Sequence, residues 1–266
     1  MSLLNERNAV GEISAFQRKS PRTAKINIHR ALKSTPFPKH KIITILGLPV
    51  LFNVLTFFIE NKIIYFWQKI LELFIRFTEM PATLSVDNNL GKSFLGTIIP
   101  YIDIPIYHPS NTQWLIGASF FLIIIVLSYI LPEKAAPLRY AFRLIAFIQG
   151  TALLYFTFWP ADFPHSVKEY TLGYLKLGFE LIFFVPWLYA LTYYIFGFKL
   201  YYDIALTLIT ILFLSIAIPM QCFAHTLILY EGSLLWLPLL YFLFGLLLVI
   251  MAIISLFSWA MTWQQS

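Results

Sequence analysis

The residues with the clearest chemical potential lie in IPMQCFAHTLILYEG, residues 218–232. Here the only cysteine of the chain, Cys222, stands three residues before His225 in an otherwise apolar run. Residues three or four apart share a face of a helix, so Gln221, Cys222 and His225 are expected close together. An imidazole beside a thiol favours the nucleophilic thiolate. The pair also offers two zinc-ligand types, but a zinc site needs further ligands.

A second polar stretch, FWPADFPHSVKEY at residues 158–170, follows another apolar run and carries Asp162 and His165. If both stretches leave a membrane on the same side, these residues share a surface with His225 and Glu231. Histidines and carboxylates serve general acid–base catalysis and many metal sites. Asp162, His165 and His225 are therefore candidate catalytic residues, and a solvated polar rim is the alternative interpretation. Their spacing specifies no geometry, so we predict no cofactor and assign no metal ligand.

Three polar residues lie inside apolar runs, where they are candidates for a transport pathway or proton-linked role: Asn53, Gln149 and Glu180. Ionisable residues at such positions are functional candidates by default. Hydrogen bonds between helices are the alternative for the two amides. Lys176 precedes Glu180 by four residues, so a salt bridge on one helix face is the alternative for the carboxylate.

The composition indicates what surrounds these residues. Of the 266 residues, 59% are hydrophobic and only 12% are charged, and the mean hydropathy is +0.74. Average soluble domains carry about twice this fraction of charge. The chain is therefore expected to be an integral membrane protein. A single cysteine excludes an intrachain disulfide and a CxxC metal or redox motif.

Six apolar runs have a length near the 20 residues that a helix needs to cross a bilayer. They lack the alternation of barrel strands, and lipid requires backbone hydrogen bonds to close within each segment. The sequence therefore predicts an all-α polytopic bundle. Its six crossings are expected at residues 42–59, 114–131, 140–159, 177–198, 204–223 and 234–259.

Residues 61–77, NKIIYFWQKILELFIRF, are apolar but carry Lys69, Glu72 and Arg76 on one side of a helix. This pattern predicts an amphipathic helix lying in the membrane interface. Charge parity favours the same interpretation, because the positive residues at 134–143 and the basic N-terminal arm then share one side of the membrane.

Residues 1–41 form that arm, with nine Lys or Arg against two Glu and a local net charge of +7. A basic segment beside an apolar run favours cytoplasmic retention and attraction to anionic lipid over nucleic-acid binding. The other domain, residues 42–266, is then the six-helix transmembrane domain, with both termini on the cytoplasmic or matrix side. An outer loop at residues 78–113 is expected to be irregular and to pack over the helices or against another subunit.

These observations favour a non-enzymatic membrane subunit of a larger assembly, contributing to transport, export or complex architecture. A bacterial or organellar inner membrane fits the charge bias. The expected partners are other membrane subunits and lipids, including anionic headgroups at the arm. Two alternatives remain open. One is a permease or channel with a pathway near Asn53, Gln149 and Glu180, and the other is an outer-face enzyme acting on a lipid-linked substrate.

Overall fold

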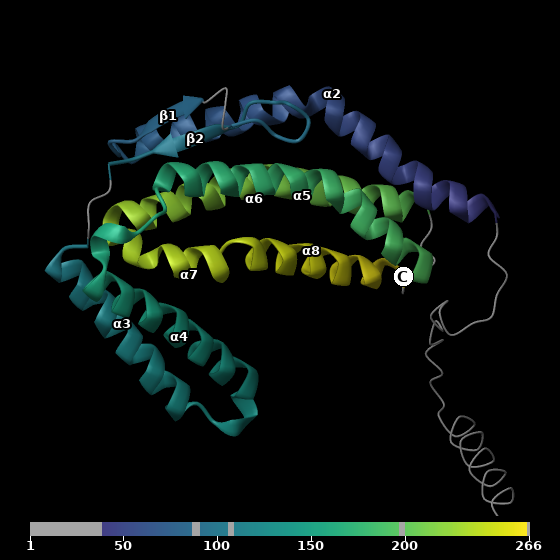
Figure 1. Ribbon diagram of the computed structural model, residues 1–266. Helices are drawn as coiled ribbons and strands as arrows, with labels where there is room; N and C mark the ends of the chain where they lie inside the picture. The colour runs from purple at the N-terminus through teal and green to yellow at the C-terminus, as the bar shows by residue number, and fades with distance from the viewer. Residues whose placement is uncertain (1–38, 87–90, 106–108, 197–199, 265–266) are drawn as a thin grey trace, which may run out of the picture.

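The computed structural model describes residues 39–86, 91–105, 109–196 and 200–264, and these residues are mostly helical (Figure 1). Six helical segments are long and apolar enough to cross a membrane, and each overlaps one of the predicted runs. The helical fold and its suitability for a membrane are thus confirmed. Residues 1–38 of the predicted basic arm lie outside the described residues. The helices are α2 Lys39–Phe77, α3 Asn111–Ile130, α4 Ala136–Phe158, α5 Val167–Phe196, α6 Leu200–Gly232, α7 Leu237–Phe242 and α8 Leu246–Met261, and the strands are β1 Thr83–Val86 and β2 Pro100–Asp103.

The helices run up and down between two ends of the bundle (Figure 1). One end holds the close of α2, α4 and α6 and the start of α3, α5 and α7; we call it the hairpin end, after the strands β1 and β2 nearby. The start of α2 and the close of α8 lie at the opposite end. Short 3-10 segments complete the connections: η2 Glu133–Ala135, η3 Pro160–Asp162, η4 Leu234–Trp236 and η5 Thr262–Gln264.

The first long helix, α2, continues without interruption through residues 60–62, where the sequence predicts that a crossing ends. Its 39 residues correspond to about 58 Å. The predicted interfacial helix at 61–77 is not seen as a separate element. Instead this segment packs along the bundle, since Trp67 and Leu71 are fully buried. The apolar side of this segment thus packs against other helices of the same chain.

The contact between α2 and α6 includes a buried hydrogen bond. The indole Nε1 of Trp67 donates to the backbone oxygen of Ser215 at 2.7 Å. About two turns further along, the ring of Phe74 stacks on that of Phe223 with centroids 5.0 Å apart. From the first pair to the second, the residue numbers increase in both helices, so α2 lies parallel to α6.

Close packing also joins α5 to α6. Gly178 of α5 faces Ile218, and an added Cβ at this glycine lies only 2.5 Å from the Cγ2 of that isoleucine. Small residues at helix contacts let backbones approach closely. Further along, the hydroxyl groups of Tyr189 and Thr210 are 2.9 Å apart. Helices α2, α5 and α6 thus form the densely packed centre of the bundle.

The connection between α2 and α3 contains a small antiparallel hairpin, β1–β2, in which Thr83 pairs with Asp103. It packs over α5, and its two strands differ from the irregular structure expected for residues 78–113. Ile102 is fully buried, its backbone nitrogen donates to Thr171 Oγ1 at 3.2 Å, and that hydroxyl donates to the Ile102 carbonyl at 3.0 Å. Beyond the strands, Phe94 contacts Phe183 of α5 with ring centroids 4.7 Å apart.

Helices α3 and α4 form a hairpin that diverges from α7 and α8 with distance from the hairpin end (Figure 1). Helix α3 starts with a capping box in which Ser110 and Gln113 satisfy each other's backbone nitrogens. The two helices meet at Gly117, where an added Cβ lies 3.5 Å from the Nε2 of Gln149.

The sixth predicted crossing, residues 234–259, corresponds to a candidate membrane span at Leu234–Met261, but this span is not one continuous helix. The structure interrupts it between Phe242 and Leu246, and this divides it into α7 and α8. The side-chain nitrogen of Gln221 donates to the freed carbonyl of Phe244. A Cβ at Gly245 sits 2.4 Å from the Tyr241 carbonyl oxygen, so the backbone at the interruption leaves no room for a side chain.

Candidate functional site

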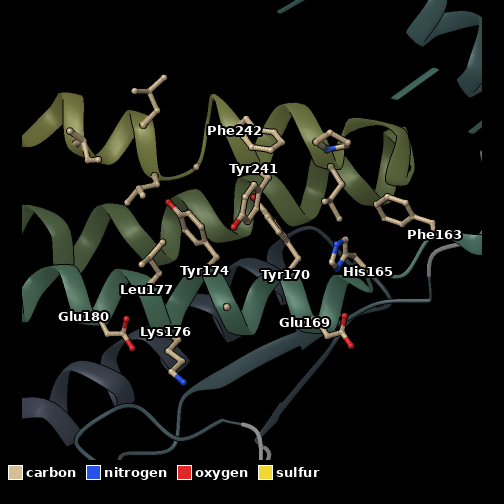
Figure 2. A pocket seen from close by; sticks show the side chains of 17 residues that line it. Phe163, His165, Glu169, Tyr170, Tyr174, Lys176, Leu177, Glu180, Tyr241 and Phe242 are labelled. Atoms are coloured by element: carbon tan, nitrogen blue, oxygen red, sulfur yellow. The ribbon is translucent and has the colours of Figure 1, made fainter. Parts of the chain in front are cut away.

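A pocket of about 1020 Å³ lies between α5 and the α7–α8 pair, near the hairpin end (Figure 2). We call it the α5–α8 pocket. Its size is typical of small-molecule sites, which are mostly apolar with a few polar groups. The two sides of this pocket differ in chemistry, because they come from helices with different sequence patterns.

The α5 side of the pocket is polar. Glu169, Gly173, Lys176 and Glu180 all line it, and their spacing of three or four residues places them on one stripe of the helix. In the view of Figure 2, the charged ends of the stripe lie on the opposite side of the α5 ribbon from the tyrosine rings. Because no Cβ stands at Gly173, and nothing lies within 4 Å of where one would be, the middle of the stripe is open.

Tyrosines lie deeper, on the side of α5 that approaches α6. The hydroxyl of Tyr170 is 2.7 Å from Nδ1 of His225, and the ring of Tyr174 is 5.4 Å from the imidazole between centroids. Tyr174 is only 8% exposed, and its buried hydroxyl has no hydrogen-bond partner among the described residues. Tyr241 of α7 faces the same space (Figure 2).

The α7–α8 side of the pocket is apolar and includes the interruption between the two helices. Leu237, Phe242, Leu246 and Ile250 line it together with the backbone of Gly245. Irregular backbone at membrane depth is tolerated where protein covers it or where it lines a cavity. At this interruption Gln221 covers the Phe244 carbonyl, and Gly245 lines the pocket. The irregular backbone is therefore partly covered by protein and partly lines a cavity.

The structure brings some of the predicted site residues to this pocket and leaves others apart. His165 and Glu180 line it. His225 lies behind it and is joined to it through Tyr170. Asp162 is exposed in η3. Among the described residues, no hydrogen bond or ring contact joins His225 to Asp162 or His165.

Cys222 is fully buried in α6. Its backbone oxygen accepts a hydrogen bond from Thr226 at 2.8 Å. No group of three or more His, Cys, Asp and Glu that could hold a metal ion occurs in the described part of the chain. Glu231 was expected on the same polar surface as His225. Its backbone oxygen accepts a hydrogen bond from Gln113 Nε2 at 2.9 Å.

The two predicted amides have different surroundings, both apart from the pocket. With its amide oriented to satisfy both atoms, Asn53 donates to the carbonyl of Phe183 at 2.9 Å and accepts from Trp187 Nε1 at 2.7 Å. It thereby joins α2 to α5. Gln149 is fully buried in α4, and neither of its side-chain polar atoms has a partner in the described residues.

Sequence reasoning missed the three pocket tyrosines, Tyr170, Tyr174 and Tyr241. The four-residue spacing of the first two, just after a polar stretch, is the signal that could have indicated a shared helix face. The predicted salt bridge of Lys176 with Glu180 is not formed in the described structure, although both residues line the pocket.

Comparison of the chain with protein-family models, with curated proteins and with solved structures finds no match.

Proposed function

We propose that this chain is a non-enzymatic integral membrane subunit of a larger assembly, contributing to transport, export or complex architecture. The observation that supports this proposal is how little of α8 its own chain covers. Only Val249, Ile253 and Ala260 are buried in this 16-residue helix, and they form one narrow stripe. Helix α3 buries a similarly narrow set, Gly117, Ile124 and Ser128.

Apolar exposure by itself does not require a protein partner, because lipid covers such a surface equally well. Association of helices in a bilayer depends instead on van der Waals packing. A crossing that contacts its own chain through a single stripe leaves most of its surface for packing against other subunits. The divergence of the α3–α4 hairpin from α8 leaves such surface on both sides (Figure 1).

The test is the mass of the protein extracted in a mild detergent, measured by light scattering and native mass spectrometry. We expect a complex heavier than one chain, and a monodisperse lone chain contradicts the proposal. Ile254→Trp adds bulk to an exposed position of α8 and should reduce the complex without lowering the thermal stability of the chain. Phe58→Trp, at an exposed position of α2, is the matched control. It should change neither the amount of complex nor the thermal stability of the chain.

We also propose an inner membrane of bacterial or organellar type, with both termini on the cytoplasmic or matrix side. The positive charge of the N-terminal arm supports this orientation. In oriented vesicles, a membrane-impermeant thiol reagent should label Lys92→Cys from the outer side and Gln264→Cys only after the vesicles are opened. The reverse pattern contradicts the proposed orientation. Cys222 is fully buried and contributes little background.

A permease is the second candidate, and the position of Glu180 on the α5–α8 pocket favours it. In that case Glu180→Gln should change flux or its dependence on pH, and unchanged flux excludes this carboxylate from the pathway. The outer-face enzyme acting on a lipid-linked substrate stays a weaker proposal. Of its three candidate residues, only His165 lines the pocket directly, and alanine at both His165 and His225 should abolish any such activity.

A further inference from the structure

The α5–α8 pocket is amphipathic across its width. Leucine, phenylalanine and isoleucine side chains of α7 and α8 line one side of it. Helix α5 lines the other side with tyrosines and, past the open position at Gly173, with the charged residues of its stripe, whose ends point away from the tyrosine rings (Figure 2). The two sides run alongside each other for a similar distance, because Glu169 to Glu180 on α5 and Leu237 to Ile250 on α7–α8 each span about 16 to 20 Å. A ligand that fills this space must itself have one polar and one apolar part, as a membrane lipid has.

The hydroxyl of Tyr174 indicates that the polar part of the pocket is incomplete without a ligand. This side chain is more than nine-tenths buried, and its oxygen has no hydrogen-bond partner among the described residues. Leaving a buried hydroxyl without a partner costs about 1–3 kcal/mol. Figure 2 shows Tyr174 directed into the space between α5 and α7–α8, where an oxygen of a bound lipid can supply the missing partner.

The charges on the pocket distinguish between headgroups. Glu169 and Glu180 are acidic and Lys176 is basic, and all three belong to the stripe on α5. A phosphate bonds to an ammonium group such as that of Lys176, and an ammonium group bonds to carboxylates. Tyrosine ring faces also attract ammonium groups. A headgroup with both charges satisfies this set, whereas an anionic headgroup meets two carboxylates and a single lysine.

We propose that the α5–α8 pocket binds one zwitterionic membrane lipid, with its headgroup on the α5 stripe and an acyl chain along α7–α8. The lipid phosphate pairs with Lys176, its ammonium group lies by Glu169 or Glu180, and Tyr174 bonds to an oxygen of the lipid. This site does not depend on the proposed assembly role, because a single chain contains every residue that forms it.

The test is lipid binding to the purified, delipidated full chain, followed by native mass spectrometry. Three probes carry identical acyl chains: phosphatidylethanolamine, phosphatidylglycerol and diacylglycerol. We expect one phosphatidylethanolamine to bind about tenfold more tightly than either of the other two. Equal binding of all three shows a non-specific lipid shell, and tighter binding of phosphatidylglycerol shows an anionic site; either result overturns the proposal.

Two variants locate the lipid. Gly173→Trp fills the open middle of the stripe and should weaken phosphatidylethanolamine binding by about tenfold or more. Gly47→Trp is the matched control in α2, since nothing lies within 4 Å of a Cβ at either glycine, and it should leave binding unchanged. Tyr174→Phe keeps the ring, and loss of the hydroxyl should weaken binding by about threefold to tenfold. Binding that neither variant weakens places the lipid elsewhere and refutes the assignment.

Discussion

The indole Nε1 of Trp67 in α2 donates a hydrogen bond to the backbone oxygen of Ser215 in α6, at 2.7 Å. Four residues after Ser215 the helix contains Pro219, which has no N–H group to donate to that oxygen. The indole therefore replaces the hydrogen bond that the proline removes. Trp67 is fully buried, so no water can do this in its place, and a proline inside one helix specifies where another helix docks.

Trp67→Phe should destabilise the protein by about 2–4 kcal/mol, because it leaves a buried carbonyl without a partner and removes buried volume. Pro219→Ala restores an N–H group to α6. The double variant should therefore recover part of the loss, as measured by thermal unfolding in detergent. A double variant that is as unstable as the sum of the single variants contradicts this account. Trp259→Phe, at an exposed position, is the control and should have little effect.

Tyr170 and His225, at the back of the pocket, should also be coupled in their effects on stability. Tyr170→Phe leaves the buried imidazole nitrogen without its partner and should cost about 1–3 kcal/mol. Combining it with His225→Phe removes both polar groups and should cost less than the two single changes together. Tyr241→Phe provides the control, because that ring is exposed. Additive losses in equilibrium unfolding exclude coupling of the pair.

Two glycines of α5 give opposite expectations for the same change. Gly178→Ala places a methyl group 2.5 Å from the side chain of Ile218, and this overpacking should cost about 1–3 kcal/mol. Gly173→Ala meets no neighbouring atom and should stabilise the helix by about 0.5–1 kcal/mol. Thermal unfolding of the two variants side by side measures the difference. Equal effects of both changes disprove the close approach of α5 to α6 at Gly178.

Gln221 should hold the interruption between α7 and α8 in place. Gln221→Leu removes the donor to the Phe244 carbonyl and should speed amide hydrogen exchange at residues 241–247 while leaving exchange in α5 unchanged. Gln113→Leu loses a hydrogen bond to a backbone oxygen elsewhere and serves as control. If exchange at the interruption stays at the wild-type rate, the glutamine does not stabilise it.

The six helices could be predicted because lipid imposes length and apolarity on every crossing, and both are readable from the sequence. The interruption at Gly245 could not be predicted from the sequence. It lies in the uniformly apolar run LPLLYFLFGLLLVIMAII, and the reason for it, a donor from Gln221, comes from another helix. Residues 61–77 were misleading for a related reason: Lys69 and Glu72 pair on the exposed side, and only the assembled bundle shows that Trp67, on the apolar side, packs against α6.

The candidate site was predictable only in part. His165 and Glu180 were selected because ionisable residues are rare in such a chain. Tyr174 was not selected, because aromatic residues make up 18% of the sequence and one tyrosine among them carries little information. What distinguishes Tyr174 is a missing partner for its hydroxyl, and the lack of a partner is a property of three-dimensional surroundings.

The contact of Phe94 with Phe183 has a consequence for how a bilayer would fit around this chain. It brings the connection between β1 and β2 alongside α5 to a point sixteen residues from the start of that helix. Hydrocarbon cannot satisfy the backbone groups of such a non-helical segment, so in a bilayer we expect the hydrocarbon on this side to begin beyond Phe183. The thirteen residues of α5 that remain span about 20 Å, whereas the twenty residues of α3 span about 30 Å. Hydrophobic mismatch of this kind is relieved by local thinning of the bilayer, so in a membrane we expect a thinner bilayer beside α5 than beside α3.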